Sequence, residues 1–217
     1  MSSATQAPAV SGQPHRAIVY VDGFNLYFGL KSKGYKRFYW LDIQQLAEHI
    51  LPADRVLAGV KYFTADIKAG TDKHRRQQTF LDALATHTTK LQIIRGRYLI
   101  KKRQCHKCGN IAFVPEEKKT DVNIASHVLV DAFTDQFDVA YLVSGDSDLV
   151  PPIEIIKTHH ETKRVLVAFP PARQSDELKR AAHAHFWINE QQLRLSQLPN
   201  PVTKPNGHQL ARPREWK

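Results

Sequence analysis

Short apolar runs rich in Val, Ile and Leu alternate along most of the chain with segments whose apolar residues recur at helical spacing. Apolar runs bounded by turn residues are typical of buried strands, and helical spacing is typical of helices that pack on one face. The runs predict strands within residues 16–25 and at residues 55–64, 91–101, 111–114, 139–143 and 163–168. The helical spacing predicts helices at residues 24–33, 42–50, 71–88, 120–134, 148–159 and 176–185. This alternation predicts an α/β domain of three layers (α/β/α, Rossmann-like) with a mostly parallel central sheet.

The two ends of the chain differ in composition from this alternating part. Residues 1–14 are rich in Ser, Ala, Pro and Gln, which predicts a disordered tail. Residues 197–217 are rich in proline and basic residues, and we expect them to form a flexible tail. The remaining residues, 15–196, are enough for one domain with its own hydrophobic core.

Net charge adds a first indication of the partner. The chain has 31 Lys and Arg against 21 Asp and Glu, which gives +10 at neutral pH. A positive field attracts polyanions, of which nucleic acids are the commonest. Because the sequence has neither an apolar stretch long enough for a membrane helix nor a hydrophobic signal core, we expect no membrane partner and a cytoplasmic location.

Acidic residues follow the predicted strands at one edge of the sheet. Asp22 follows the first strand, Asp146 and Asp148 follow the strand at 139–143, and Asp121 opens the helix at 120–134. In open parallel sheets the ligand site lies beyond the carboxyl ends of the strands. Carboxylate oxygens around a small cavity suit Mg²⁺ or Mn²⁺, and such an ion in a basic protein is what metal-dependent cleavage of a phosphodiester requires.

Each acid also has a purely structural explanation. Asp121 is a candidate for helix capping, Asp22 for a turn, and Asp146 and Asp148 for the start of the following helix. A D-x-D pair also occurs in nucleotide-sugar transferases. For the structural explanations to suffice, all of them would have to hold at the same edge of the sheet. Such a coincidence is less probable than one shared role, so we prefer the metal site.

Three motifs in order, VDGFNLYF, EEKKTDVNIASHVLVDA and YLVSGDSDLVPPIEII, resemble the LabA-like branch of the NYN domain family, within the PIN-domain-like ribonucleases. The resemblance extends from about Ala17 to Asn189. It implies a PIN-like α/β/α fold and a metal-dependent ribonuclease site. The residues at the family's matching positions are Asp22, Asn25, Asp121, Ser144, Asp146 and Asp148.

One position departs from the family's pattern. Relatives often carry an aspartate in the segment after the last predicted strand, and His183 stands there in this chain. If the position supports the metal, His183 would weaken or alter metal binding. The alternative is a surface histidine at the end of a helix.

Basic and aromatic residues occur together, without any acidic residue, in two stretches, KSKGYKRFYW and RGRYLIKKRQCHKC. Mixtures of aromatic and basic side chains commonly hold single-stranded RNA, although we assign Phe38 and Trp40 to the core instead. The residues predicted to bind RNA, which include two from the helix at 71–88, are Lys31, Lys33, Lys36, Arg37, Arg75, Arg76, Arg95, Arg97, Lys101, Lys102 and Arg103.

Cys105 and Cys108 are the only cysteines and lie in a predicted β-hairpin. Their spacing is that of half a zinc site, but four ligands are needed and the chain has no second C-x-x-C. His106, distant histidines or a second chain in a homodimer would have to complete it. The alternative is a hairpin tip without a metal.

Three hypotheses for the function follow. The first is a ribonuclease that uses Mg²⁺ or Mn²⁺ at the aspartates. The second is a non-catalytic or weakly catalytic RNA-binding regulatory module, which would bind RNA without divalent metal. A nucleotide-sugar or nucleotide-binding enzyme that uses the D-x-D pair is a third hypothesis.

Overall fold

A computed structural model describes residues 14–67, 69–104 and 109–216, with only the backbone described at residues 97–104 and 112–118. Its strands are β1 (His15–Asp22), β2 (Arg55–Ala65), β3 (Leu91–Gln104), β4 (Ile111–Lys118), β5 (Val139–Val143), β6 (Arg164–Phe169), β7 (Ala184–Trp187), β8 (Val202–Thr203) and β9 (Gln209–Leu210). Its α-helices are α1 (Gly23–Ser32), α2 (Ile43–Ile50), α3 (Asp72–His87), α4 (Thr120–Phe133), α5 (Val150–His159), α6 (Asp176–Ala181) and α7 (Glu190–Leu195). Short 3₁₀ helices are η1 (Lys36–Phe38), η2 (Ser147–Leu149) and η3 (Arg214–Trp216).

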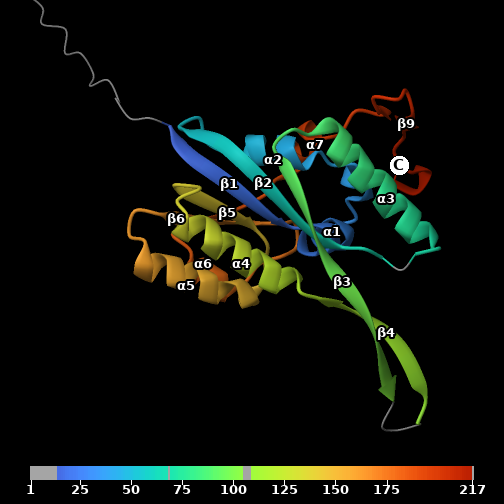
Figure 1. Cartoon of the computed structure of the whole chain (residues 1–217), viewed down its shortest axis with the longest axis horizontal. Coiled ribbons are helices and arrows are strands. Elements are labelled where there is room, and N and C mark those ends of the chain that lie inside the picture. The colour runs from blue at the N-terminus through green and yellow to red at the C-terminus, as the bar shows by residue number, and fades with distance from the viewer. Residues whose placement is uncertain (1–13, 68, 105–108, 217) are drawn as a thin grey trace, which may run out of the picture.

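Seven strands form one sheet in the order β4-β3-β2-β1-β5-β6-β7, and only the β3–β4 pair is antiparallel. Successive side chains of β1 point to opposite faces, so Val19 lies in one core and Tyr20 in the other. Helices α1, α2, α3 and α7 cover the first face, and α4, α5 and α6 cover the second (Figure 1). The predicted three-layer α/β fold with a mostly parallel sheet is confirmed.

The order of the strands places a crevice next to β1. β2 lies on one side of β1 and β5 on the other, so the order along the sheet reverses there. The carboxyl ends of adjacent strands at such a point are the usual location of a ligand site in open α/β sheets. Val21 is paired with Val143, which brings the residues just after both strands together.

The ribbon formed by β3 and β4 extends beyond the rest of the domain (Figure 1). Both strands are longer than predicted, because β3 continues to Gln104 and β4 to Lys118. Cys105 and Cys108, the two residues of the predicted zinc site, lie outside the described residues, so that hypothesis stays untested.

The predicted helix at 176–185 is wrong in its second half. Helix α6 ends at Ala181, and the backbone of Ala182 is extended. The chain then adds β7 as a parallel edge strand beside β6. The hydrogen bonds to β6 outweigh the weak helical periodicity of this alanine- and histidine-rich stretch.

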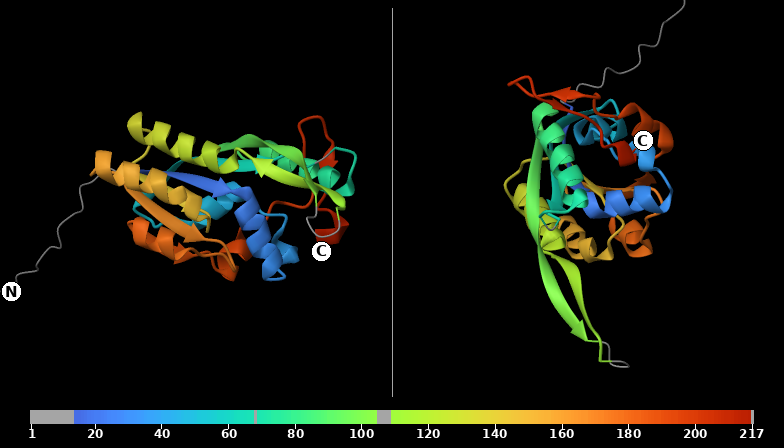
Figure 2. Two further views of the ribbon diagram at one scale, coloured as in Figure 1. Left: turned by 90° about the horizontal axis from the view of Figure 1, so that it is seen from below. Right: turned by 90° about the vertical axis from the view of Figure 1, so that its right-hand side faces the viewer.

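The segment after residue 197 is ordered against the domain, contrary to the expectation of a flexible tail. It pairs β8 with β9 and lies along α3 (Figure 2). Leu198, Val202 and Leu210 are buried, and the Trp216 ring packs edge-on against that of Phe80 at 6.0 Å between centroids. Prolines prevent regular periodicity here, so the few apolar residues that anchor the segment give no pattern in the sequence.

None of the helices in the described ranges is both long enough and apolar enough to cross a bilayer.

Candidate active site

Asp22 is the last residue of β1 and the N-cap of α1. Its carboxylate accepts a hydrogen bond from the backbone N–H of Asn25 at 2.9 Å and one from Ser144 Oγ at 3.0 Å. Only 4% of Asp22 is exposed. Both donors are neutral, so the buried carboxylate is held in place without a neighbouring cation.

Asn25 and Ser144 join the turn after β1 to the turn after β5. The Gly145 N–H donates to Asn25 Oδ1 at 3.0 Å, and the Asp146 N–H donates to Ser144 Oγ at 3.1 Å. Ser144 therefore donates to one acid while it accepts from the backbone of another. The two turns cannot shift relative to each other without breaking these hydrogen bonds.

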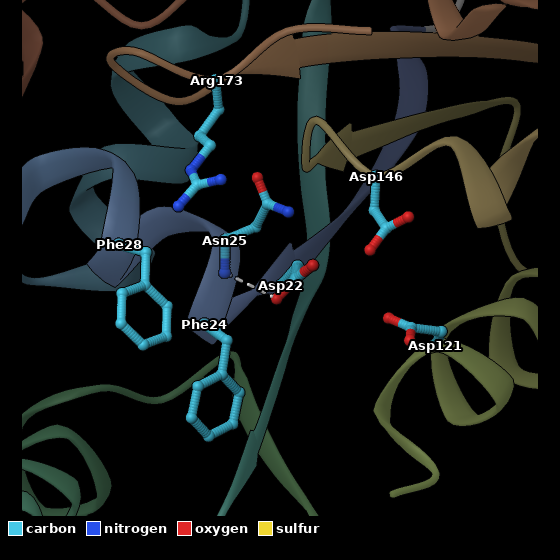
Figure 3. A pocket seen from close by; sticks show the side chains of 7 residues that line it. All are labelled: Asp22, Phe24, Asn25, Phe28, Asp121, Asp146 and Arg173. Carbon is cyan, nitrogen blue, oxygen red and sulfur yellow. Dashed lines mark hydrogen bonds between the residues drawn. The ribbon is translucent and has the colours of Figure 1, made fainter. Parts of the chain in front are cut away.

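The side chains of Asp22, Asp121 and Asp146 converge on one pocket of about 160 Å³ (Figure 3). Asp146 follows β5, and its carboxylate accepts from the Asp148 N–H at 3.0 Å, which starts η2. Asp121 lies in the first turn of α4, the helix that covers the second face of the sheet together with α5 and α6. Asp148 is exposed and does not line the pocket. The structure thus brings three of the four predicted acids together.

Burial and mutual repulsion raise the pKa of two acids of the pocket. Burial raises the pKa of Asp22 from 3.8 to about 6, against the lowering effect of its two hydrogen bonds, and the charges of Asp121 and Asp146 raise it further. Burial also raises the pKa of Asp121, and the charges of Asp146 and Asp148 add to this effect. Asp148 therefore contributes to the field of the pocket although its side chain lies outside.

Comparison with known proteins shows the family of the chain. The family model of the NYN domain matches residues 16–190. This chain belongs to the NYN domain family. The chain is also 31% identical to 6-hydroxy-3-succinoylpyridine 3-monooxygenase HspA of Pseudomonas putida (strain DSM 28022 / S16) over 248 residues, 95% of this chain and 77% of HspA.

A solved structure resembles the NYN domain in fold. It is the crystal structure of a protein of unknown function from Vibrio parahaemolyticus RIMD 2210633, with a TM-score of 0.55 and 19% sequence identity. The match covers 84% of this chain and 98% of that chain. At this identity the likeness shows the three-layer architecture and nothing about chemistry.

The pocket of the NYN domain also contains residues that the sequence did not single out. Phe24 and Phe28 from α1 and Arg173 from the loop after β6 complete its lining (Figure 3). The two phenylalanines are one helical turn apart and next to Asp22, which is a usable signal in the sequence. The proline-rich loop that carries Arg173 offers no such signal.

Most of the arginines predicted to bind RNA form ion pairs within the NYN domain. Arg37 pairs with Glu190 at 2.7 Å and Arg76 with Glu215 at 3.3 Å, while Arg75 and Arg95 pair with Asp72 and Asp66. The side chains that are exposed and form no ion pair with a described residue are Lys31, Lys33 and Lys36. The side chains of Arg97, Lys101, Lys102 and Arg103 lie outside the described parts of the structure. Phe38 and Trp40 are buried, as predicted.

His183 is not part of the acidic site. Its Nδ1 accepts a hydrogen bond from the Val165 N–H at 3.0 Å, at the amino end of β6. The acids lie at the carboxyl ends of the strands, on the opposite edge of the sheet. The departure from the family's pattern at this position therefore does not alter the pocket.

The pocket fits a divalent cation that keeps much of its water. Within the described residues, no three His, Cys, Asp or Glu side chains are close enough to form a metal site by themselves. Mg²⁺ and Mn²⁺ are commonly held by one or two carboxylates together with water and substrate phosphate. A buried carboxylate with acidic neighbours and neutral hydrogen-bond donors supplies the charge for such an ion, but the predicted shell of four direct protein ligands is not formed.

Proposed function

We propose that this NYN domain, of the LabA-like branch, is a metal-dependent ribonuclease that hydrolyses phosphodiester bonds of RNA at the acid pocket. The observation that carries the proposal is the convergence of Asp22, Asp121 and Asp146 beyond the carboxyl ends of β1 and β5. Three carboxylates that repel each other in a small cavity favour a bound cation. The exposed lysines in the last turn of α1 and just after it supply the positive surface for an RNA backbone.

Asp22 and Asp146 would hold Mg²⁺ or Mn²⁺, with Asp121 and Asp148 acting directly or through water. Such an ion, when bound, would neutralise charge on the phosphate and lower the pKa of a water molecule. Ser144 and Asn25 fix the orientation of the Asp22 carboxylate through its own hydrogen bonds and those of the turn after β5. Arg173 lies across the pocket from Asp121, where its guanidinium is available to a phosphate oxygen (Figure 3).

The test is cleavage of a labelled single-stranded RNA with Mn²⁺, with Mg²⁺ and with EDTA. We expect cleavage only with a divalent metal, and a loss of more than about 100-fold in Asp22→Asn and in Asp146→Asn. Asp176→Asn makes the same chemical change at an exposed aspartate of α6 and should keep full activity. RNA that is bound but uncut with every metal would instead support the RNA-binding regulatory module.

A second candidate function is oxygenation of an aromatic carboxylic acid. The sequence identity to HspA, a 6-hydroxy-3-succinoylpyridine 3-monooxygenase, favours it, and the pocket offers aromatic rings beside an arginine. The reaction would need dioxygen and an external reductant. Conversion of 6-hydroxy-3-succinoylpyridine with NADH or NADPH in air, with and without added flavin, together with no cleavage of RNA, would establish this function in place of the first.

A further inference from the structure

One wall of the acid pocket is neither acidic nor polar. Phe24 and Phe28 lie on the side of the pocket away from Asp121, with Arg173 above them (Figure 3). Their ring centroids are 6.4 Å apart, and the ring planes differ by 27°. The two rings therefore offer a nearly continuous aromatic surface beside the acids.

Of the two rings, Phe24 is half-buried and Phe28 is exposed, although a helix of this size would normally turn polar residues to water. Helix α1 buries Leu26 and Leu30 in the core, whereas 41% of Phe28 is exposed. The neighbouring Tyr27 is 40% exposed and contacts the edge of the Phe28 ring at 5.3 Å between centroids. Exposed aromatic residues gathered at the mouth of a pocket mark a binding surface more often than scattered ones do.

Arg173 is held next to these rings by close backbone packing. A Cβ atom at Gly29 would lie 2.5 Å from Pro171 O and 3.2 Å from Arg173 Cγ. A Cβ atom at Gly145 would lie 3.0 Å from the Gln174 N and 3.1 Å from Arg173 Cβ. The two glycines thus let the loop after β6 pack against both α1 and the turn after β5. This packing holds the aliphatic part of Arg173 against Gly29, the residue that follows Phe28.

The guanidinium of Arg173 has no protein partner in the described parts of the chain. Its Nε is buried without a hydrogen bond, and the guanidinium forms no ion pair with the pocket acids. A buried donor left without an acceptor is costly, and guanidinium groups bind phosphate and carboxylate through paired hydrogen bonds. Lys31 lies over the Phe28 ring at 5.9 Å and adds a second cation at the same edge.

We infer that Phe24, Phe28 and Arg173 form a subsite for one unpaired nucleotide, with its base against the rings and its phosphate against the guanidinium. The inference rests on the proposed function and restricts its substrate to single-stranded RNA. In a duplex both faces of each base are covered by the neighbouring bases, so the rings would have no face to bind. The subsite would place the phosphate that follows the bound base next to the acids.

The test measures binding in EDTA, where cleavage does not interfere. A short fluorescent single-stranded RNA is compared with an abasic oligonucleotide of equal length, which keeps every phosphate and lacks the bases. We expect Phe28→Ala to weaken binding of the RNA about tenfold and to leave binding of the abasic oligonucleotide unchanged. Arg173→Ala should weaken binding of both, and more strongly at low salt.

Matched variants exclude indirect effects. Phe133→Ala removes another exposed phenylalanine, from α4, and Arg194→Ala removes an exposed arginine from α7; both should bind like the wild type. Thermal melting of each variant checks that the fold is kept. An equal loss for RNA and abasic oligonucleotide in Phe28→Ala, or no loss for either, would overturn the inference.

The same titration with 6-hydroxy-3-succinoylpyridine tests whether the subsite binds a nucleotide of RNA or a small aromatic compound with a carboxylate. If this compound binds in a manner that depends on Phe28 and Arg173 while RNA binding does not, the subsite takes an aromatic carboxylate and the nucleotide assignment is wrong. The proposed function fails differently, because cleavage that survives Asp22→Asn and Asp146→Asn would refute it whatever the binding data show.

Discussion

Two nearly fully buried aspartates of this domain have opposite surroundings. Asp131 in α4 accepts hydrogen bonds from Lys61 Nζ and from Tyr20 Oη, both at 2.6 Å. Asp22 accepts only from the neutral groups of Asn25 and Ser144, and its charged neighbours are the acids Asp121 and Asp146. The first carboxylate is paired with a lysine, whereas the second forms no ion pair with any described residue, although Arg173 lines the same pocket.

The difference separates a structural acid from a functional one. A buried carboxylate that is paired with a lysine and hydrogen-bonded can remain charged without a ligand. An ionised, buried carboxylate beside other carboxylates destabilises the folded protein unless a cation is bound there. We therefore expect the two sites to respond in opposite directions when their charges are removed.

The largest effect is expected at the paired site. Lys61→Met leaves the Asp131 charge buried without its cation, and should lower the free energy of unfolding by about 3 to 5 kcal/mol. Urea denaturation measures this. Adding Asp131→Asn to the variant removes the stranded charge and should recover much of the loss. A loss below about 1 kcal/mol would show that the Asp131 carboxylate does not depend on Lys61, and the contrast between Asp131 and Asp22 would then fail.

Asp22→Asn should have the opposite effect. The pKa of Asp22 in the folded protein is raised from 3.8 to about 6, so ionisation costs stability as the pH rises through about 6. Without metal at pH 7.5, the variant should therefore be more stable than the wild type by roughly 2 to 3 kcal/mol. The gain should disappear near pH 4, where the carboxyl is protonated in the folded state. Urea denaturation at both pH values checks it, and a destabilised variant at pH 7.5 would contradict the account.

Ser144→Ala tests how the acids are held. It removes the donor to Asp22 and the acceptor of the Asp146 N–H, both within a residue that is 1% exposed. We expect Mn²⁺ affinity to fall about tenfold and stability to fall by about 1 kcal/mol. Calorimetric titration measures the affinity. Ser126→Ala, at an exposed position of α4, should change neither.

The last prediction concerns the pH dependence of metal binding. Since a cation must displace the proton from Asp22, Mn²⁺ affinity should be constant above pH 7 and fall about tenfold per unit below about pH 6. The Asp22→Asn protein should lack this dependence. An affinity that is flat down to pH 5 in the wild type would mean that Asp22 does not contact the ion.

Local signals in the sequence were sufficient for six of the seven strands of the sheet and for the three acids that line the pocket. Asp22, Asp146 and Asp121 follow or precede elements with clear periodicity, so the rule on the carboxyl ends of parallel strands locates them. Asp148, predicted from the same motif, is exposed and does not line the pocket, and its backbone N–H donates to the Asp146 carboxylate at the start of η2.

The remaining features depend on contacts between distant parts of the chain. Arg173 reaches the pocket because glycines far away in sequence allow its loop to pack closely. The segment ending in Trp216 is ordered by the aromatic rings it meets on α3 and near Trp40. His183 has the chemistry of a metal ligand, but the start of β7 places it on the other edge of the sheet. No local pattern records these contacts.

The most direct test of the central claim is calorimetric titration of Mn²⁺ into the metal-free protein at pH 7.5, without RNA. The account predicts saturable binding by the wild type, at least tenfold weaker binding by Asp22→Asn, and unchanged binding by Asp176→Asn. Equal affinities in the wild type and Asp22→Asn, or no binding by the wild type, would contradict the claim that this buried, unpaired carboxylate serves a cation.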